Sequence, residues 1–201
     1  MLLRKLWKFR AGILGLGIVA GVCGLAIFAG SVSPHDPYDQ EIANRLTPPA
    51  WAERGSSAHL LGTDPVGRDI LSRLIYGGQI SLATGVVSVL IAASIGIVLG
   101  LLGGYYGGAV DSVINNLVNT VIVTSSLEVA RMIIQESFLS FLGLGVQPPT
   151  PSWGGMLGEG RTYMLTHPWL ATFPGLAIFV TTLGINLLGD GLRDLLDPHR
   201  Y

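Results

Sequence analysis

The sequence contains few charged residues and a single cysteine. Charged side chains make up 12% of its 201 residues, whereas a soluble domain carries about 25%. The formal net charge is −1, so no basic surface field is available to hold nucleic acid. Because Cys23 is the only cysteine, one chain cannot form a disulfide or a cysteine-based metal site. The composition therefore predicts a protein surrounded mostly by lipid or by other protein rather than by water.

The sequence also lacks the short motifs of common enzymes. It has no Gly-x-x-x-x-Gly-Lys-Ser/Thr loop for ATP and no Gly-x-Ser-x-Gly elbow for a serine hydrolase. The histidines are dispersed and show no metal-ligand spacing such as His-Glu-x-x-His; they are His35, His59, His167 and His199. Nothing in the sequence pairs a serine with a histidine into an intramembrane hydrolase. We therefore predict no catalytic residue, no cofactor and no metal site.

Long apolar runs are abundant, and they predict transmembrane helices. A helix needs about 20 apolar residues to cross the hydrocarbon core. Residues 11–32, about 80–102 and about 169–188 form uncharged runs of that length. One more span, the third in chain order, is composite. Residues 110–122 have the apolar spacing of an amphipathic helix, and a largely apolar run at about 129–146 follows. The expected fold class is an all-α integral membrane protein with about four spans.

The first apolar run follows a cluster of cationic residues, which predicts its orientation. The run has 22 residues, whereas the apolar part of a signal peptide has about 7–15, so we interpret it as a retained anchor. The positive-inside rule places the N-terminus in the cytoplasm, and four spans return the C-terminus to the same side. The predicted segments are a cytoplasmic basic segment (1–10), the first span (11–32), an extracytoplasmic segment with a surface helix (33–79), a transmembrane domain (80–190) and a cytoplasmic tail (191–201).

Two polar segments are expected outside the membrane. In the first, Asp64 precedes a proline and is positioned to cap the short surface helix. Asp69 and Arg73 lie four residues apart and are expected to pair on that helix. The second segment, about residues 146–167, is too polar to cross and should return over the outer surface, with Trp153 at the level of the lipid headgroups.

A few polar residues lie within the predicted spans. Glu136 is the only charge in the apolar part of its run, and a carboxylate at mid-membrane costs about 2.5–3.5 kcal/mol unless it faces a bundle interior or a watery cavity. It is the best candidate for a role beyond packing. Asn115 and Asn119 lie on the polar face of the amphipathic helix, and Asn186 lies at the inner end of the last span. These residues either line a translocation path or form ordinary hydrogen bonds between helices.

Glycines recur four residues apart in two of the predicted spans. Small residues at this spacing allow helix backbones to approach closely in lipid. The alternative is that glycine is simply frequent in membrane helices. The candidate packing positions are Gly17, Gly21, Gly96, Gly100 and Gly104.

Three strings of residues resemble the permease subunit of bacterial ABC-type dipeptide/oligopeptide (peptide/nickel) importers. Residues 61–74 read LGTDPVGRDILSRL, residues 140–154 read SFLGLGVQPPTPSWG and residues 188–194 read LGDGLRD. The resemblance implies a multi-pass protein of the bacterial inner membrane that works by alternating access. It also implies a second homologous permease subunit, two cytoplasmic ATP-binding subunits that hydrolyse ATP, and an extracytoplasmic solute-binding protein.

The chain departs from this family near residues 119–121. The family typically has six spans and a cytoplasmic loop with a Glu-Ala-Ala signature, which docks onto the ATP-hydrolysing subunit. This sequence lacks the loop and two crossings, and it leaves the remaining segments on their proper sides. Three interpretations stay open: a permease subunit, an internally deleted form that does not transport, and a small membrane packing or scaffold protein.

Overall fold

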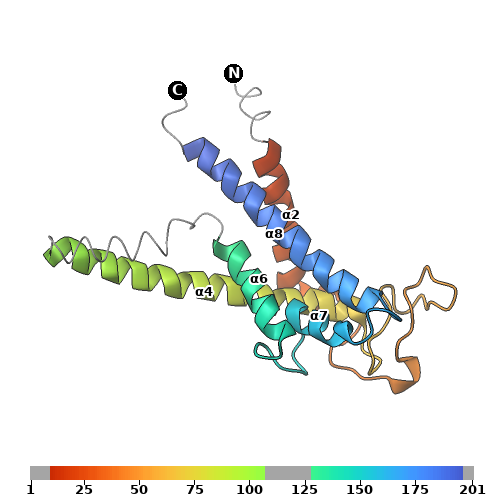
Figure 1. Cartoon of the computed structure of the whole chain (residues 1–201). Coiled ribbons are helices and arrows are strands. Elements are labelled where there is room, and N and C mark those ends of the chain that lie inside the picture. Colours follow the sequence, from red (N-terminus) through yellow and green to blue (C-terminus); the bar gives the residue numbers. More distant parts are fainter. Residues whose placement is uncertain (1–9, 107–127, 197–201) are drawn as a thin grey trace.

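Helices form the regular structure of the part of the chain that is described. The computed structural model describes residues 10–106 and 128–196. Within these ranges it contains no strand, only an isolated bridge between Thr63 and Asp69, so the all-α fold class is confirmed. In chain order the helices are α2 (Arg10–Ile27), α3 (Ala29–Val32), the 3-10 helix η1 (Ile42–Asn44), α4 (Ile70–Tyr106), α6 (Glu128–Phe141), α7 (Trp153–Arg161) and α8 (Trp169–Leu196) (Figure 1).

Three of these helices are long and apolar enough to cross a membrane. They are α2, the part of α4 from Ile70 to Val98, and α8 from Trp169 to Gly191. They cover the first, second and last of the four predicted spans. Of the composite third span, α6 is described, with 14 residues, and residues 107–127 lie outside the described part.

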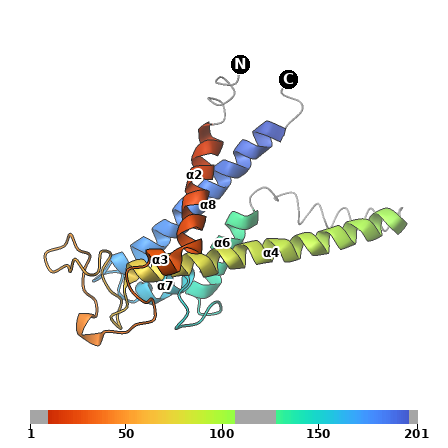
Figure 2. The same ribbon diagram turned by 180° about the vertical axis from the view of Figure 1, so that it is seen from behind.

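Helices α2 and α8 run antiparallel and side by side (Figures 1 and 2). Glycines allow their close approach: a Cβ placed on Gly15 would lie 2.6 Å from the carbonyl oxygen of Gly184. A Cβ on Gly184 would lie 2.6 Å from the side chain of Ile18. The helix pair therefore depends on two glycines that the four-residue spacing did not identify.

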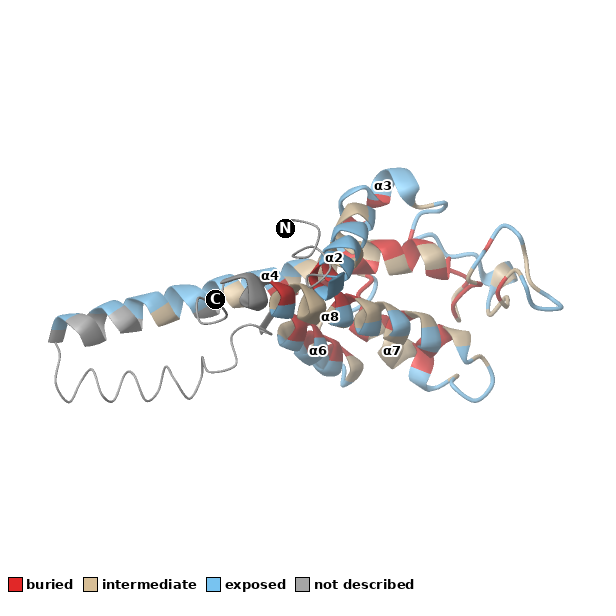
Figure 3. Ribbon diagram, turned by 90° about the horizontal axis from the view of Figure 1, so that it is seen from above, coloured by how far each residue is buried: buried red, intermediate tan, exposed pale blue. Residues whose placement is uncertain are grey.

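Helix α4 extends far beyond the rest of the fold. Its first turns contact α6 and α7, whereas its second half extends away from the other described helices (Figures 1 and 3). Large apolar side chains on this half are exposed within the chain, from Val86 to Leu101. In water such a surface would be unfavourable, so lipid or another helix is its natural environment.

The N-terminus of α4 differs from the prediction. Asp69, not Asp64, caps the helix: its Oδ2 accepts hydrogen bonds from the amide (2.8 Å) and hydroxyl (2.7 Å) of Ser72. Asp64 instead closes a tight turn, in which Gly67 has a positive φ of 85° and Asp64 Oδ1 accepts from the amides of Val66 and Arg68. The surface helix and the second span are thus one continuous helix of 37 residues.

Helices α6 and α7 pack over the beginning of α4. Ser152 caps α7 by accepting a hydrogen bond of 3.1 Å from the amide of Gly155. The small buried apolar core beside these helices consists of Ile70, Met156 and Leu170. This junction of α4, α6 and α7 holds most of the buried polar side chains discussed below.

Candidate functional site

Glu136 lies buried between α4 and α6, with 7% of its surface exposed. The hydroxyl of Ser140, one turn further along α6, donates to Glu136 Oε1 at 2.7 Å. Two longer hydrogen bonds reach Oε2, from Ser81 of α4 at 3.4 Å and from Ser137 at 3.5 Å. A buried carboxylate needs such partners because desolvation otherwise makes its charge very costly. The cluster of Glu136, Ser81, Ser137 and Ser140 is called the Glu136 site below.

Tight helix contacts hold the Glu136 site in place. The amide of Trp153 donates to the hydroxyl of Ser81 at 3.3 Å, and its indole nitrogen donates to the carbonyl oxygen of Leu74 at 2.8 Å. A Cβ on Gly78 would approach the Trp153 ring to 3.1 Å. The ring therefore fills the space beside α4 that the glycine leaves, and it fixes Ser81 against the carboxylate. Trp153 is 3% exposed, so its ring is packed inside the helix bundle, and its expected place at the headgroup level stays a prediction.

Helix α7 also contacts α6 directly. A Cβ on Gly154 would lie 2.7 Å from the carbonyl oxygen of Ser137, and one on Gly158 would lie 3.3 Å from the backbone of Phe141. A side chain at Gly154 would therefore clash with the backbone of α6, whereas one at Gly158 would make a tight contact. Helix α7, which lies within the predicted outer polar segment (about residues 146–167), is thus part of the helix bundle.

A second polar cluster joins the start of α4 to α7. Asp64 Oδ2 accepts from Arg68 Nε and from Arg73 Nη1, each at 2.6 Å. Glu159 of α7 meets the same arginines, with Oε2 at 3.2 Å from Arg68 Nη2 and 2.7 Å from Arg73 Nη1. The expected pairing of Asp69 with Arg73 is wrong, because Arg73 turns to Asp64 and Glu159. The cluster of Asp64, Arg68, Arg73 and Glu159 is called the arginine clamp.

The arginine clamp could not be predicted from the sequence, because Glu159 lies 86 residues from Arg73 along the chain. The one signal in the sequence was the density of charge at residues 64–73 in a chain otherwise poor in charge. Three members of the clamp are almost fully buried. Since buried charges are found paired, the clamp fixes α7, and with it Trp153, against α4.

The remaining predicted site residues are three asparagines and the packing glycines. Asn186 lies on α8, and its Oδ1 is buried without a hydrogen-bond partner among the described residues. Asn115 and Asn119 lie outside the described residues. For Gly17 and Gly21, an added Cβ would meet no atom of the described residues within 4 Å, so packing at these two glycines stays a prediction.

Gly96 lies on the second half of α4, and the side-chain environment of Gly100 and Gly104 lies outside the described part. Packing at these three glycines also stays a prediction.

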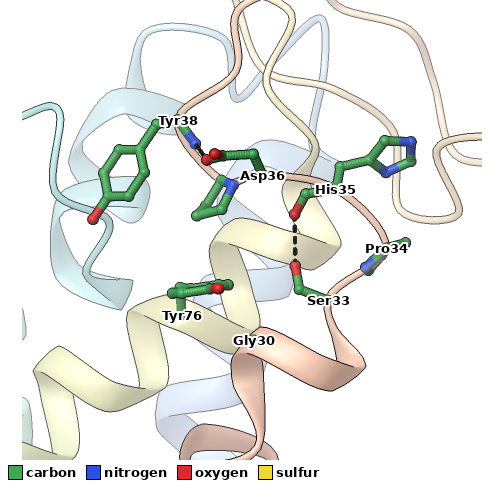
Figure 4. Close-up of a pocket in the computed structure, with 8 residues that line it drawn as sticks. Gly30, Ser33, Pro34, His35, Asp36, Tyr38 and Tyr76 are labelled. Atoms are coloured by element: carbon green, nitrogen blue, oxygen red, sulfur yellow. Dashed lines mark hydrogen bonds between the residues drawn. The ribbon is translucent and has the colours of Figure 1, made fainter.

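A separate cavity of about 400 Å³ opens beside α3 and the start of α4. Figure 4 shows Tyr76 of α4 facing the loop at Ser33 to Tyr38 across this space. The Ser33 hydroxyl donates to the carbonyl oxygen of His35 at 2.8 Å, and the His35 ring points away from the cavity (Figure 4). The cavity is therefore distinct from the Glu136 site.

Known families match both ends of the chain. Residues 1–49 match the N-terminal TM domain of oligopeptide transport permease C. Residues 109–200 match the binding-protein-dependent transport system inner membrane component. The dipeptide transport system permease protein DppC of Escherichia coli (strain K12) is 34% identical, in an alignment covering 98% of this chain and 93% of the relative. The chain belongs to this permease family. It is therefore a multi-pass transport permease of the bacterial inner membrane.

Other members of the permease family show the same degree of similarity. The di/tripeptide transport system permease protein DppC of Pseudomonas aeruginosa (strain UCBPP-PA14) is 33% identical, over 98% of this chain and 92% of its own length. The glutathione transport system permease protein GsiD of Pectobacterium atrosepticum is 34% identical, over 98% of this chain and 88% of its own length. Both relatives are named as transport permeases.

The alignment with the E. coli permease also reveals a shortened interior. It spans 278 positions, whereas the chain has 201 residues, so at least 77 positions of the alignment (278 minus 201) have no residue of this chain. Because the alignment reaches almost all of both proteins, these positions lie inside it. This finding supports the predicted internal shortening. Its predicted place near residues 119–121 lies outside the described residues.

Proposed function

We propose that this chain is a permease subunit that moves dipeptides, tripeptides or related small solutes such as glutathione across the inner membrane. The observation that carries the proposal is the end-to-end similarity to dipeptide permeases. Its partners are a second homologous permease, two cytoplasmic ATP-binding subunits that hydrolyse ATP, and an extracytoplasmic solute-binding protein. Both termini lie in the cytoplasm, in accordance with the cationic residues before α2.

Within this proposal, the Glu136 site is a polar element of the permease interior. It lies where three helices meet, and its carboxylate is shared between serines of α4 and α6. A rearrangement of α4 relative to α6 would break the longer bond to Ser81 and keep the shorter bond to Ser140. The site is therefore suited to respond to the helix movements of alternating access.

The Glu136→Gln variant tests this role. An amide keeps the volume but removes the charge, and a hydrogen bond to a charged group contributes about 1.5–3 kcal/mol. Since about 1.4 kcal/mol corresponds to a factor of ten, we expect dipeptide uptake per assembled complex to fall on the order of tenfold. The matched control is Glu53→Gln, at an exposed loop position, which should transport normally. Equal uptake by Glu136→Gln and the control would show that the site is only structural.

The second candidate function is that of a form that assembles without transporting. The missing alignment positions favour it, because they remove helices that other members of the family have. The exposed apolar side chains on the second half of α4 also favour it, since no helix of the described residues covers them. The two candidates differ in their binding of the ATP-hydrolysing subunits. A membrane scaffold unrelated to transport would still associate with the companion permease, but it would bind neither the ATP-binding subunits nor the solute-binding protein.

Affinity purification from the source membrane separates these candidates. A tagged copy of the full chain is solubilised in mild detergent, and the captured subunits are identified by mass spectrometry. A transport-competent subunit should capture the companion permease and the ATP-binding subunits in stoichiometric amounts. Capture of the companion permease alone would favour the form that does not transport, and capture of neither would overturn both candidates.

A further inference from the structure

Two of the dispersed histidines meet at one buried carboxylate. His35 follows α3, His59 lies in the long loop before α4, and Asp69 immediately precedes α4. His59 Nδ1 lies 3.0 Å from Asp69 Oδ1, and His35 Nδ1 lies 3.9 Å from Asp69 Oδ2. The two imidazole rings are 4.8 Å apart between centroids. The spacing in sequence gave no sign of this group, because the loop brings together residues that are 24 and 10 positions apart.

The charge of Asp69 has no arginine partner among the described residues. Asp69 is 2% exposed, and isolation of a carboxylate from water is costly without a nearby cation. The neighbouring Arg68 and Arg73 are both held by the acids of the arginine clamp. The groups that face the Asp69 carboxylate are instead the two imidazoles and Ser72. A cation bound beside the Asp69 carboxylate would therefore neutralise its charge.

The surrounding hydrogen bonds hold the three side chains in position. The Ser72 hydroxyl donates to Asp69 Oδ2 at 2.7 Å and accepts from the amide of His35 at 3.1 Å. One hydroxyl thus links the loop that carries His35 to the carboxylate. Metal sites typically have such outer partners, which orient the ligands.

We propose that His35, His59 and Asp69 bind one divalent transition-metal cation, with Zn²⁺ as the best match. Two imidazole nitrogens and a carboxylate oxygen form a ligand set that zinc accepts. The ligand atoms of the three residues all lie within 4.8 Å of one another. In a tetrahedral zinc site they lie about 3.3 Å apart, because the bonds are about 2.0–2.2 Å long. The ligand atoms would therefore have to move together by up to about 1.5 Å to reach this geometry.

The metal would join the loop to the start of α4. His35 is exposed on one side, with 39% of its side chain accessible, so a water molecule or an incoming ligand has access to the fourth position. The site lies away from the Glu136 site and does not depend on the proposed transport function. The competing interpretation is a direct hydrogen bond between the His59 imidazole and Asp69, which needs no metal.

Zinc binding by the full chain tests the proposal. The protein is purified in detergent, stripped with a chelator and titrated with ZnCl₂ in competition with a chromogenic chelator. Bound metal is counted by elemental analysis, and Co²⁺ is used as a spectroscopic probe of the ligand geometry. The variants are His35→Gln and His59→Gln, and the matched control is His167→Gln, at a histidine that contacts Thr166 and lies outside the cluster.

We expect one zinc ion per chain, visible absorption bands of tetrahedral Co²⁺, and a loss of affinity of about 100-fold in both cluster variants. The control variant should bind as the unmodified chain does. His35 is partly exposed, so His35→Gln provides a decisive comparison even where His59→Gln fails to fold. Absence of bound zinc in the unmodified chain, or equal affinity in His35→Gln and the control, would overturn the proposal and leave a direct hydrogen bond between His59 and Asp69.

Discussion

Asp64 is the residue whose replacement most directly tests the arginine clamp. Its Oδ1 accepts from the amides of Val66 and Arg68, both at 2.9 Å. Its Oδ2 accepts from the guanidinium groups of Arg68 and Arg73, both at 2.6 Å. In Asp64→Asn the remaining carbonyl oxygen can preserve the turn. The new amide group presents hydrogens to two cations, and the clamp keeps two positive charges with one acid.

The expected loss of stability follows from the burial of these charges. Removal of one partner from a buried ion pair costs about 3–5 kcal/mol, because the other charge remains buried and without a counter-charge. Glu159 still contacts both arginines and is itself 25% exposed, which places the Asp64→Asn loss near the lower end of that range. For the same reason Glu159→Gln should cost less than Asp64→Asn, since water can reach the vacated position.

Equilibrium unfolding of the full chain in detergent micelles, followed by circular dichroism, measures this loss. The matched control is Asp39→Asn, which makes the same chemical change at an exposed loop position and should alter the free energy of unfolding by less than about 0.5 kcal/mol. An Asp64→Asn variant as stable as this control would refute the reasoning. A larger loss in Glu159→Gln than in Asp64→Asn would show that the burial of Asp64 does not decide the energetics.

Two further predictions concern the helix contacts. Gly15→Ala should lower the free energy of unfolding by about 1–3 kcal/mol, because the new Cβ would meet the backbone of α8 at Gly184. Gly17→Ala, which has open space around it, is the control and should leave the free energy of unfolding unchanged in the same assay. Equal losses in the two variants would contradict the close approach of α2 and α8 at Gly15. Trp153→Phe should cost about 1–3 kcal/mol, because it leaves the Leu74 carbonyl without its indole donor; thermal unfolding unchanged from that of the unmodified chain would argue against this bond.

Features that depend on local composition could be predicted from the sequence. The long helices follow from uncharged runs, since only a helix satisfies its own backbone groups in lipid. Glu136 was identified for a similar reason, because a charge in an apolar run requires a polar enclosure. Its serine partner Ser140 lies four residues further along the same helix, but Ser81 comes from another helix.

Features that depend on distant contacts could not be predicted. Asp64 has the local signals of a helix cap, yet the positive φ of Gly67 turns the chain back and moves the helix start to Ile70. Trp153 is of the residue type that is enriched at membrane interfaces, but the glycines of α4 leave space in which its ring is buried. His35 and His59 stand far apart in the sequence and meet only because the loop before α4 folds back onto Asp69.

The central claim is that this shortened chain is a working peptide permease subunit. The most direct test is uptake of a labelled dipeptide by proteoliposomes that contain the chain, its companion permease and the ATP-binding subunits, with the solute-binding protein added outside. We predict ATP-dependent accumulation that disappears when the chain is left out. Absence of uptake, under conditions in which a full-length permease of the family restores it, would contradict the claim.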